Sequence, residues 1–173
     1  MGDEVFGLGS ATEAELAVLS AFVKKPASLD WAEAAALGVA GETAVRGLDL
    51  LSVGAGSTVL IDGGAGGVGS VAVQVAAARG AKVIATASER NHGFLRDLGA
   101  EPVLYGDGMS DRVRAVAPDG VDAVFDVVGK TPITDLIELA PDPQHVVSIA
   151  NFGAAEHGAR VTGGGDHTPK GRA

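Results

Sequence analysis

The sequence predicts an α/β protein built on a doubly wound, mostly parallel β-sheet. From Ser57 onward, short apolar runs rich in β-branched residues alternate with segments of helical period. A glycine-rich turn joins the first of these runs to the first helical segment. Such alternation is typical of right-handed βαβ units, in which neighbouring strands are parallel. With 46% hydrophobic residues in 173, the chain can bury a real core.

The expected strands are short and separated by single helices. They span 57–62, 82–86, 103–105, 121–128 and 146–149, with a short sixth strand over 160–162. The first helix is expected over 67–79 and is ended by Gly80. The later helices comprise a short one ended by Gly99, one that begins at Ser110 or Asp111 and ends near Pro118, and one with Thr131 as N-cap and Pro132 as its first residue.

The first 56 residues have a different pattern. Segments 3–9 and 15–22 are expected to be short strands, and Asp30 with Glu33 forms a predicted capping box for a helix through Leu37. A second helix is expected over 41–51. Residues 163–173 are polar, glycine-rich and without periodicity, which predicts a disordered tail.

Charge and composition exclude several classes of function. The chain has 13 basic and 22 acidic residues, a net charge of −9 and only 4% aromatic residues, so nucleic acid is not an expected partner. It has no cysteine, and its four histidines lack metal-ligand spacing, so no metal site is predicted. No apolar run reaches membrane-spanning length, which predicts no membrane association and a cytoplasmic location.

The glycine turn matches G-x-G-x-x-G over 64–69 and lies between a predicted strand and a predicted helix. Gly64 allows the tight turn, Gly66 lets a pyrophosphate approach the backbone, and Gly69 lets the helix pack closely on the sheet. Free N–H groups around Gly67 and Val68, together with the helix dipole, favour an anionic ligand. A structural glycine turn without a ligand is the alternative.

The end of the second strand of the sheet favours NADP(H) over NAD(H). No carboxylate lies in the strand to accept hydrogen bonds from a ribose 2′-hydroxyl. Ser88 and Arg90 can instead hold a 2′-phosphate. Glu89 can turn toward the ribose, and a solvated first helical turn is the alternative interpretation of Glu89 and Arg90.

The sequence does not predict a catalytic residue. Asp122 and Asp126 share a strand at i and i+4, so one is expected to cap the strand end near the cofactor cleft, and an acid–base pair is an alternative. Arg46, Lys130 and Asp135 lie near helix or strand ends, with no geometric argument for any of them.

Several blocks of the sequence resemble medium-chain dehydrogenase/reductases, in particular the zinc-independent quinone oxidoreductase branch that includes ζ-crystallin. The resemblance covers about 2–162 and rests on GDEVFG (2–7), AELAV (14–18), KPASL (25–29), AAAL (34–37), VAGETA (39–44), GGAGGVG (63–69), DVVG (126–129) and SIA (148–150). It implies a Rossmann fold of strand order 3-2-1-4-5-6. It also implies NADPH-dependent reduction of quinones or α,β-unsaturated carbonyls by hydride transfer from nicotinamide.

The resemblance also implies roles for individual residues. Residues 66–69 would hold the pyrophosphate, with Ser88 and Arg90 on the 2′-phosphate. The other implied contacts are Tyr105 near the adenosine or phosphates, Val127 and Val128 beside the ribose and adenine, and Ala150, Asn151, Phe152 and Thr43 near the nicotinamide.

Members of this family are longer, so the chain is expected to be truncated at both ends. The predicted domains are a remnant of the GroES-like catalytic lobe (1–28), an NADP-binding Rossmann domain (29–162) and the tail (163–173). Because half of the substrate pocket would be missing, a non-catalytic dinucleotide-binding module or redox sensor is the main alternative. An S-adenosylmethionine methyltransferase is a further alternative, although it normally has an acid at the end of the second strand. A short last strand leaves an open sheet edge, which predicts a homodimer.

Overall fold

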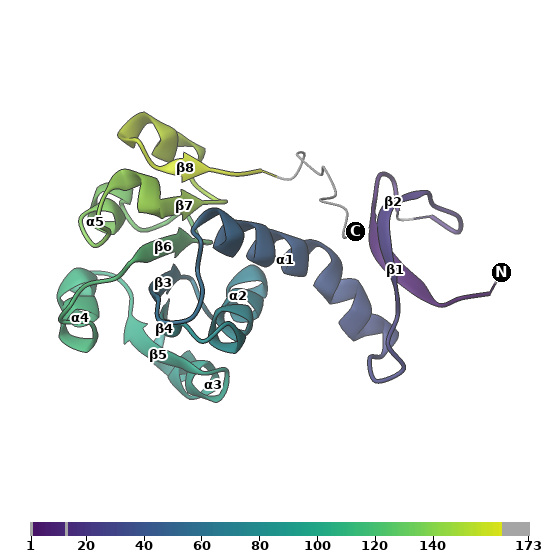
Figure 1. Ribbon diagram of the computed structural model, residues 1–173, viewed down its shortest axis with the longest axis horizontal. Helices are drawn as coiled ribbons and strands as arrows, with labels where there is room; N and C mark the ends of the chain where they lie inside the picture. Colours follow the sequence, from purple (N-terminus) through teal and green to yellow (C-terminus); the bar gives the residue numbers. More distant parts are fainter. Residues whose placement is uncertain (1, 13, 164–173) are drawn as a thin grey trace.

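The protein forms two sheets joined by one long helix. The computed structural model describes residues 2–12 and 14–163. Strands β1 (Val5–Gly9) and β2 (Leu19–Lys24) form an antiparallel hairpin. The other six strands form a parallel sheet in the order β5-β4-β3-β6-β7-β8, which confirms the predicted doubly wound architecture (Figure 1). Its connections reverse direction at β3, because β4 and β6 pair on opposite sides of that strand.

The predicted alternation of strands and helices is confirmed, with shifts of a few residues at the ends. The strands of the large sheet are β3 (Thr58–Asp62), β4 (Lys82–Ala87), β5 (Ala100–Leu104), β6 (Ala123–Asp126), β7 (Val146–Ser148) and β8 (Arg160–Val161). The helices are α1 (Trp31–Leu50), α2 (Gly67–Ala78), α3 (His92–Asp97), α4 (Met109–Val116) and α5 (Ile133–Ile137). Single 3-10 segments span Glu89–Asn91, Pro143–His145 and Phe152–His157.

Each face of the large sheet has its own hydrophobic core. Val59 and Ile61 of β3 point into the core under α1, α2 and α3, whereas Leu60 points into the core under α4 and α5. This alternation follows from the two-residue period of a strand. Because both faces are covered, the middle strands β3, β4, β6 and β7 are apolar except near their ends. Polar residues lie at the carboxyl ends of these strands, which is where open α/β sheets bind ligands.

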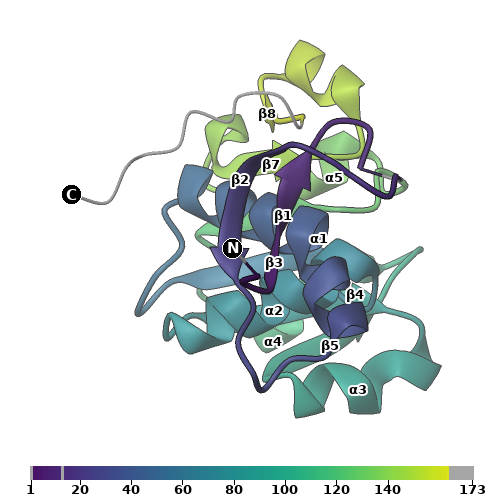
Figure 2. The same ribbon diagram turned by 90° about the vertical axis from the view of Figure 1, so that its right-hand side faces the viewer.

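The expectation of two separate helices before residue 52 is wrong. One helix, α1, runs without interruption through Gly38 and Gly41, and the predicted capping box of Asp30 and Glu33 begins it. The glycines suggested a break, but both keep helical geometry within an alanine-rich segment of high helix propensity. The hairpin packs against α1, and a Cβ on Gly38 would lie 3.4 Å from the Gly7 carbonyl oxygen. Figure 2 shows the hairpin in front of α1.

Two further local predictions are corrected. Pro132, not Thr131, is the N-cap of α5, and its side chain makes no capping hydrogen bond. The strand expected over 121–128 ends at Asp126, because the Asp126 carboxylate accepts hydrogen bonds from the next backbone N–H groups and turns the chain. The predicted tail over 163–173 lies outside the described residues except for Gly163. None of the described helices is long and apolar enough to cross a membrane.

Candidate dinucleotide site

A row of buried polar side chains crosses the carboxyl edge of the large sheet. Thr86, Asp62, Asp126 and Ser148 lie at or next to the ends of the adjacent strands β4, β3, β6 and β7, and each is at most 1% exposed. Asp62 lies opposite Asp126 in the parallel register, and Asp126 lies opposite Ser148. Buried polar groups require hydrogen-bond partners, so this row fixes the positions of the loops that follow the strands.

Asp62 and Thr86 connect the glycine turn to the neighbouring strand. The Thr86 hydroxyl donates to Asp62 Oδ1 (2.5 Å) and accepts from the backbone N–H of Gly63 (2.8 Å). The backbone N–H of Gly64 in turn donates to the Thr86 carbonyl oxygen (3.0 Å). The start of the turn is therefore held to β4 by three hydrogen bonds.

Burial raises the pKa of the Asp62 carboxyl above its ordinary value. The hydrogen bond from Thr86 opposes this rise. Thr131 faces the same carboxyl and also opposes the rise, although it forms no hydrogen bond of normal geometry to Oδ2. The negative charge of Asp126 adds to the rise. Loss of hydration is thus the dominant cause, and it favours the neutral carboxyl.

Asp126 shapes the loop after β6. Its Oδ1 accepts from the backbone N–H groups of Val128 (3.0 Å) and Gly129 (2.7 Å), and its Oδ2 accepts from the Ser148 hydroxyl (2.7 Å). The expected cap of this strand end is therefore Asp126. Asp122 lies at the opposite end of β6, where its carboxylate accepts from the Thr58 backbone N–H (2.7 Å). The two carboxylates do not form an acid–base pair, because four residues along a strand separate them by its full length.

The loops that follow β3, β4, β5 and β6 enclose a cleft of about 830 Å³. It lies at the point where the strand order reverses, which is where open α/β sheets bind ligands. Its volume is within the range of small-molecule sites. The lining residues are Asp62, Gly63, Ala65, Gly66, Thr86, Ala87, Ser88, Asn91, Tyr105 to Asp111, Val128, Lys130, Thr131, Pro132 and Asp135.

The glycine turn has the close contacts that its sequence predicts. A Cβ on Gly69 would collide with the Gly63 carbonyl oxygen and lie 2.8 Å from Gly64 Cα, so α2 packs directly on the turn. Gly66 is the N-cap of α2 and lines the cleft, and α2 has no acidic residue in its first turn. A Cβ on Gly67 would meet nothing within 4 Å. The free N–H groups at this helix start are thus accessible to an anionic group.

Two of the predicted adenosine contacts, Ser88 and Arg90, lie directly after β4. Ser88 lines the cleft and accepts a hydrogen bond from the Asn91 side chain (3.2 Å). Arg90 is exposed and has no ion pair among the residues that the structure describes. Tyr105, 56% exposed, lies across the cleft on the loop after β5.

Arg112 on α4 holds that loop in place. Its guanidinium donates to the carbonyl oxygens of Leu104 (2.9 Å) and Asp107 (2.9 Å), and also to those of Tyr105 and Gly106. The wall of the cleft that presents Tyr105 is therefore fixed by one side chain.

Four of the fourteen predicted site residues line this cleft, and five of the other ten also lie away from the glycine turn and the end of β4. Thr43 is buried on α1, Val127 packs against the core, and Ala150 contacts Gly129. Asn151 caps the following 3-10 segment through its side chain, and Phe152 is 67% exposed. All except Thr43 lie after β6 or β7, beside the cleft rather than in it. Of the remaining nine predicted residues, Gly66, Ser88, Tyr105 and Val128 line the cleft. Gly64, Gly67, Val68 and Gly69 form the turn and the first turn of α2, and Arg90 lies beside the cleft in the 3-10 segment after β4.

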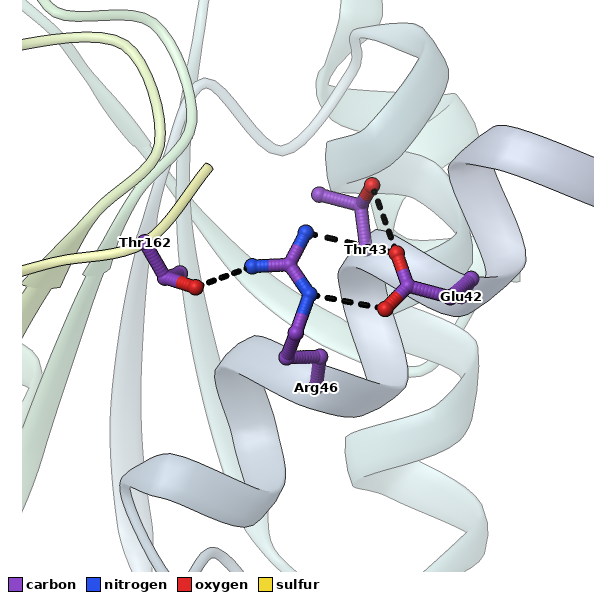
Figure 3. A network of polar contacts seen from close by, with 4 residues as sticks. All are labelled: Glu42, Thr43, Arg46 and Thr162. Carbon is purple, nitrogen blue, oxygen red and sulfur yellow. Dashed lines mark hydrogen bonds and ion pairs between the residues drawn. The ribbon is translucent and has the colours of Figure 1, made fainter. Parts of the chain in front are cut away.

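Of the three charged residues without a prior geometric argument, Lys130 and Asp135 line the cleft and Arg46 does not. Arg46 Nε donates to Glu42 Oε1 (2.7 Å), and its Nη1 donates to the hydroxyl of Thr162, just after β8 (Figure 3). The Thr43 hydroxyl also points to Glu42 (Figure 3). Arg46 therefore connects α1 to the last strand of the sheet, which is a structural role.

The parallel six-stranded sheet and its covering helices define a Rossmann-like α/β domain. Residues 67–164 match the family model described as zinc-binding dehydrogenase. The chain therefore belongs to this family, within the medium-chain dehydrogenase/reductase superfamily.

Named relatives agree with this assignment. A quinone oxidoreductase from Pongo abelii is 31% identical over 170 residues, which cover 93% of this chain and 52% of that protein. An NADPH-dependent alkenal/one oxidoreductase from Arabidopsis thaliana is 40% identical over 107 residues, which cover 61% of this chain and 27% of that protein. An alcohol dehydrogenase superfamily protein from Novosphingobium aromaticivorans superposes with a TM-score of 0.81 at 36% identity, covering 94% of this chain and 54% of that one. The chain thus spans about a quarter to a half of the length of these relatives.

The donor set does not fit a zinc site. The sequence contains no cysteine, and within 2–12 and 14–163 no three His, Asp or Glu side chains are grouped so as to hold a metal ion. No step of the proposed chemistry is therefore routed through a metal.

The sequence analysis missed Asp62, Thr86, Ser148 and Arg112 as determinants of the site. For the first three, the signal is a polar residue at the end of an otherwise apolar strand. No sequence pattern indicates the role of Arg112, because a guanidinium that binds backbone carbonyl oxygens needs no particular spacing of residue types.

Proposed function

We propose that this chain is the nucleotide-binding part of an NADPH-dependent quinone or enone reductase. The observation that supports the proposal most directly is the cleft at the β3 switch point, with the glycine turn and the free start of α2 at one side. The residues fit a dinucleotide, because the turn leaves space for a pyrophosphate where side chains would block it. The names of the relatives supply the reaction class.

The preference for NADPH rests on the β4 end of the cleft. Ser88 offers a hydroxyl, and Arg90 offers a guanidinium that is exposed and unpaired within the described part of the chain. No carboxylate ends β4 to compete for a ribose 2′-hydroxyl. None of the four acidic residues that line the cleft follows β4: Asp62 ends β3, Asp107 and Asp111 follow β5, and Asp135 lies on α5.

When bound, the nicotinamide supplies the hydride. The chain itself binds and orients: the start of α2 holds the pyrophosphate, and the Asp62–Thr86 pair fixes the turn that presents it. Thr43, Ala150, Asn151 and Phe152 are the proposed neighbours of the nicotinamide, which would extend beyond the cleft past β7. Hydride transfer also needs a dry, oriented substrate site.

A non-catalytic dinucleotide-binding module is the second candidate, since the described residues form a cleft for a dinucleotide and none of them is assigned the role of proton donor. This candidate predicts dinucleotide binding without turnover of quinones or enones. The homodimer, the cytoplasmic location and the domain boundaries at residues 28 and 162 stay predictions.

Substitution of Arg90 tests the cofactor assignment. We expect Arg90→Ala to weaken NADPH binding by about tenfold, the usual effect of one charge-assisted hydrogen bond, and to leave NADH binding unchanged. Arg96→Ala is the matched control, because Arg96 is also exposed and lies on the adjacent α3. Calorimetric titration with both cofactors measures the effect. Equal weakening of NADPH and NADH binding would contradict the assignment.

Turnover distinguishes the two candidate functions. We expect NADPH oxidation that depends on an added quinone or enone if the chain retains a substrate site. Tight NADPH binding with no oxidation across a panel of quinones and enones would support the non-catalytic module.

A further inference from the structure

One carboxylate oxygen of Asp62 forms no hydrogen bond of normal geometry with the described residues, although Thr131 faces the carboxyl. Asp62 Oδ1 accepts from Thr86, whereas Oδ2 has no hydrogen-bond partner among the residues that the structure describes. The residue is 1% exposed and lines the cleft directly before the glycine turn. A buried polar atom without a partner is costly, so a ligand in the cleft is the natural source of the missing hydrogen bond.

The surroundings of Asp62 are poor in positive charge. Asp126 faces it from β6, and Thr86 faces it from β4. The other charged or titratable side chains that line the cleft are Lys130 and Asp135 after β6, and Tyr105, Asp107 and Asp111 after β5. His92 lies beside the cleft, with its ring by the Ala87 carbonyl at the end of β4. The first turn of α2 contains no acidic side chain. Among the described residues that line the cleft, Lys130 is the one cation, whereas Asp62, Asp107, Asp111 and Asp135 contribute four carboxylates.

An anionic ligand shifts the protonation equilibrium of the Asp62 carboxyl. A pyrophosphate at the start of α2 brings negative charge close to the carboxylate, because the turn begins at the next residue. The ligand also displaces water from the cleft. Both changes favour a neutral carboxyl. A neutral carboxyl has an O–H group and can donate a hydrogen bond to a phosphate or hydroxyl oxygen, which a carboxylate cannot do.

We propose that Asp62 is a ligand-contacting residue of the cleft: its Oδ2 forms a hydrogen bond with the bound dinucleotide, and the carboxylate takes up one proton from solvent as the ligand enters. This inference rests on the proposed dinucleotide binding and adds that binding is coupled to the uptake of one proton. Burial already raises the pKa of Asp62 in the ligand-free protein, which favours uptake of the proton. Binding is therefore tighter at lower pH.

Calorimetric titration with ADP-ribose in buffers of different ionisation enthalpy measures the uptake. ADP-ribose is the probe because the 2′-phosphate of NADPH itself titrates near pH 6. Above the ordinary pKa of an aspartate, near 3.9, we expect measurable uptake of a fraction of a proton. We also expect affinity to fall as pH rises, by at most tenfold per pH unit.

Asp62→Asn keeps the shape and holds the side chain neutral, so we expect this variant to lose the uptake and the pH dependence. Asp119→Asn is the matched control, since Asp119 is an exposed carboxylate at the amino edge of the sheet. His92→Gln should also keep the uptake, which separates Asp62 from the nearby imidazole. The proposal is wrong if the wild-type protein binds ADP-ribose without proton uptake, a result that needs no variant. It is also wrong if Asp62→Asn and the wild-type protein take up equal amounts of proton. If neither ADP-ribose nor NADPH binds the wild-type protein, the proposed function itself is wrong.

Discussion

Asp62 shows how one buried side chain links folding to binding. Its hydrogen bond with Thr86 fixes the glycine turn, and its position at the end of β3 places the carboxyl at the cleft. The same burial that aligns the turn raises the pKa of the carboxyl. The residue therefore stabilises the site most when it is neutral.

The pH dependence of stability follows from this raised pKa. Below the ordinary value of an aspartate, near 3.9, both the folded and unfolded states hold the proton and the carboxyl costs nothing. As pH rises through the higher pKa of the folded state, ionisation is penalised only in that state and stability is lost. We expect the unfolding free energy of Asp62→Asn minus that of wild type to increase with pH, by at most about 1.4 kcal/mol per pH unit.

Urea unfolding between pH 4.5 and 8 measures this difference. Asp119→Asn should show no such trend, because Asp119 is exposed. If the unfolding free energy of Asp62→Asn minus that of wild type stays constant or decreases as pH rises, burial does not penalise the charged carboxyl.

Two glycines of the turn differ sharply in the space around them. Gly69→Ala places a Cβ against the Gly63 carbonyl oxygen, so we expect a loss of about 1–3 kcal/mol of stability. Gly67→Ala places its Cβ in open space and should change stability by about 0.5 kcal/mol or less. Thermal unfolding of both variants gives the comparison. Equal effects would contradict the close packing of α2 on the turn.

At the scale of the element, α1 connects the hairpin to the sheet. It packs on β1 near Gly38 and on the core strand β6 near Gly47, where the Phe125 ring occupies the space of a missing Cβ. Its continuity also sets the distance between the hairpin and the cleft. The sequence predicted the capping box that begins this helix but not its continuity, because tertiary contacts decide whether a glycine interrupts a helix.

Paired substitutions in α1 test this account. Gly41→Ala adds a methyl group in open space within a helix and should stabilise the protein by about 0.5–1 kcal/mol. Gly47→Ala forces a methyl group into the Phe125 ring and should destabilise it by about 1–3 kcal/mol. Urea unfolding of the two variants provides the measurement. Stabilisation by both would show that the ring does not pack on the glycine.

At the scale of the whole molecule, the fold was more predictable than the site. Apolar runs and helical periods gave every strand of the large sheet, because burial on both faces requires those patterns. The glycine turn and Ser88 could also be predicted, since they follow strands directly. The hydrogen bond between Thr86 and Asp62, and those from Arg112 to the loop after β5, could not be predicted. They join strands and loops that become neighbours only in the folded sheet. The positions of Thr43 and Phe152 outside the cleft depend on the same tertiary arrangement.

The central claim is that the cleft at the β3 switch point binds a dinucleotide. An NMR titration of the isotopically labelled chain with NADPH tests it directly, because each backbone amide reports separately. We predict that the shifted amides belong to the loops after β3, β4, β5 and β6, with Gly66, Ser88 and Tyr105 among them. Absence of binding, or shifts confined to the hairpin and the amino edge of the sheet, would contradict the claim.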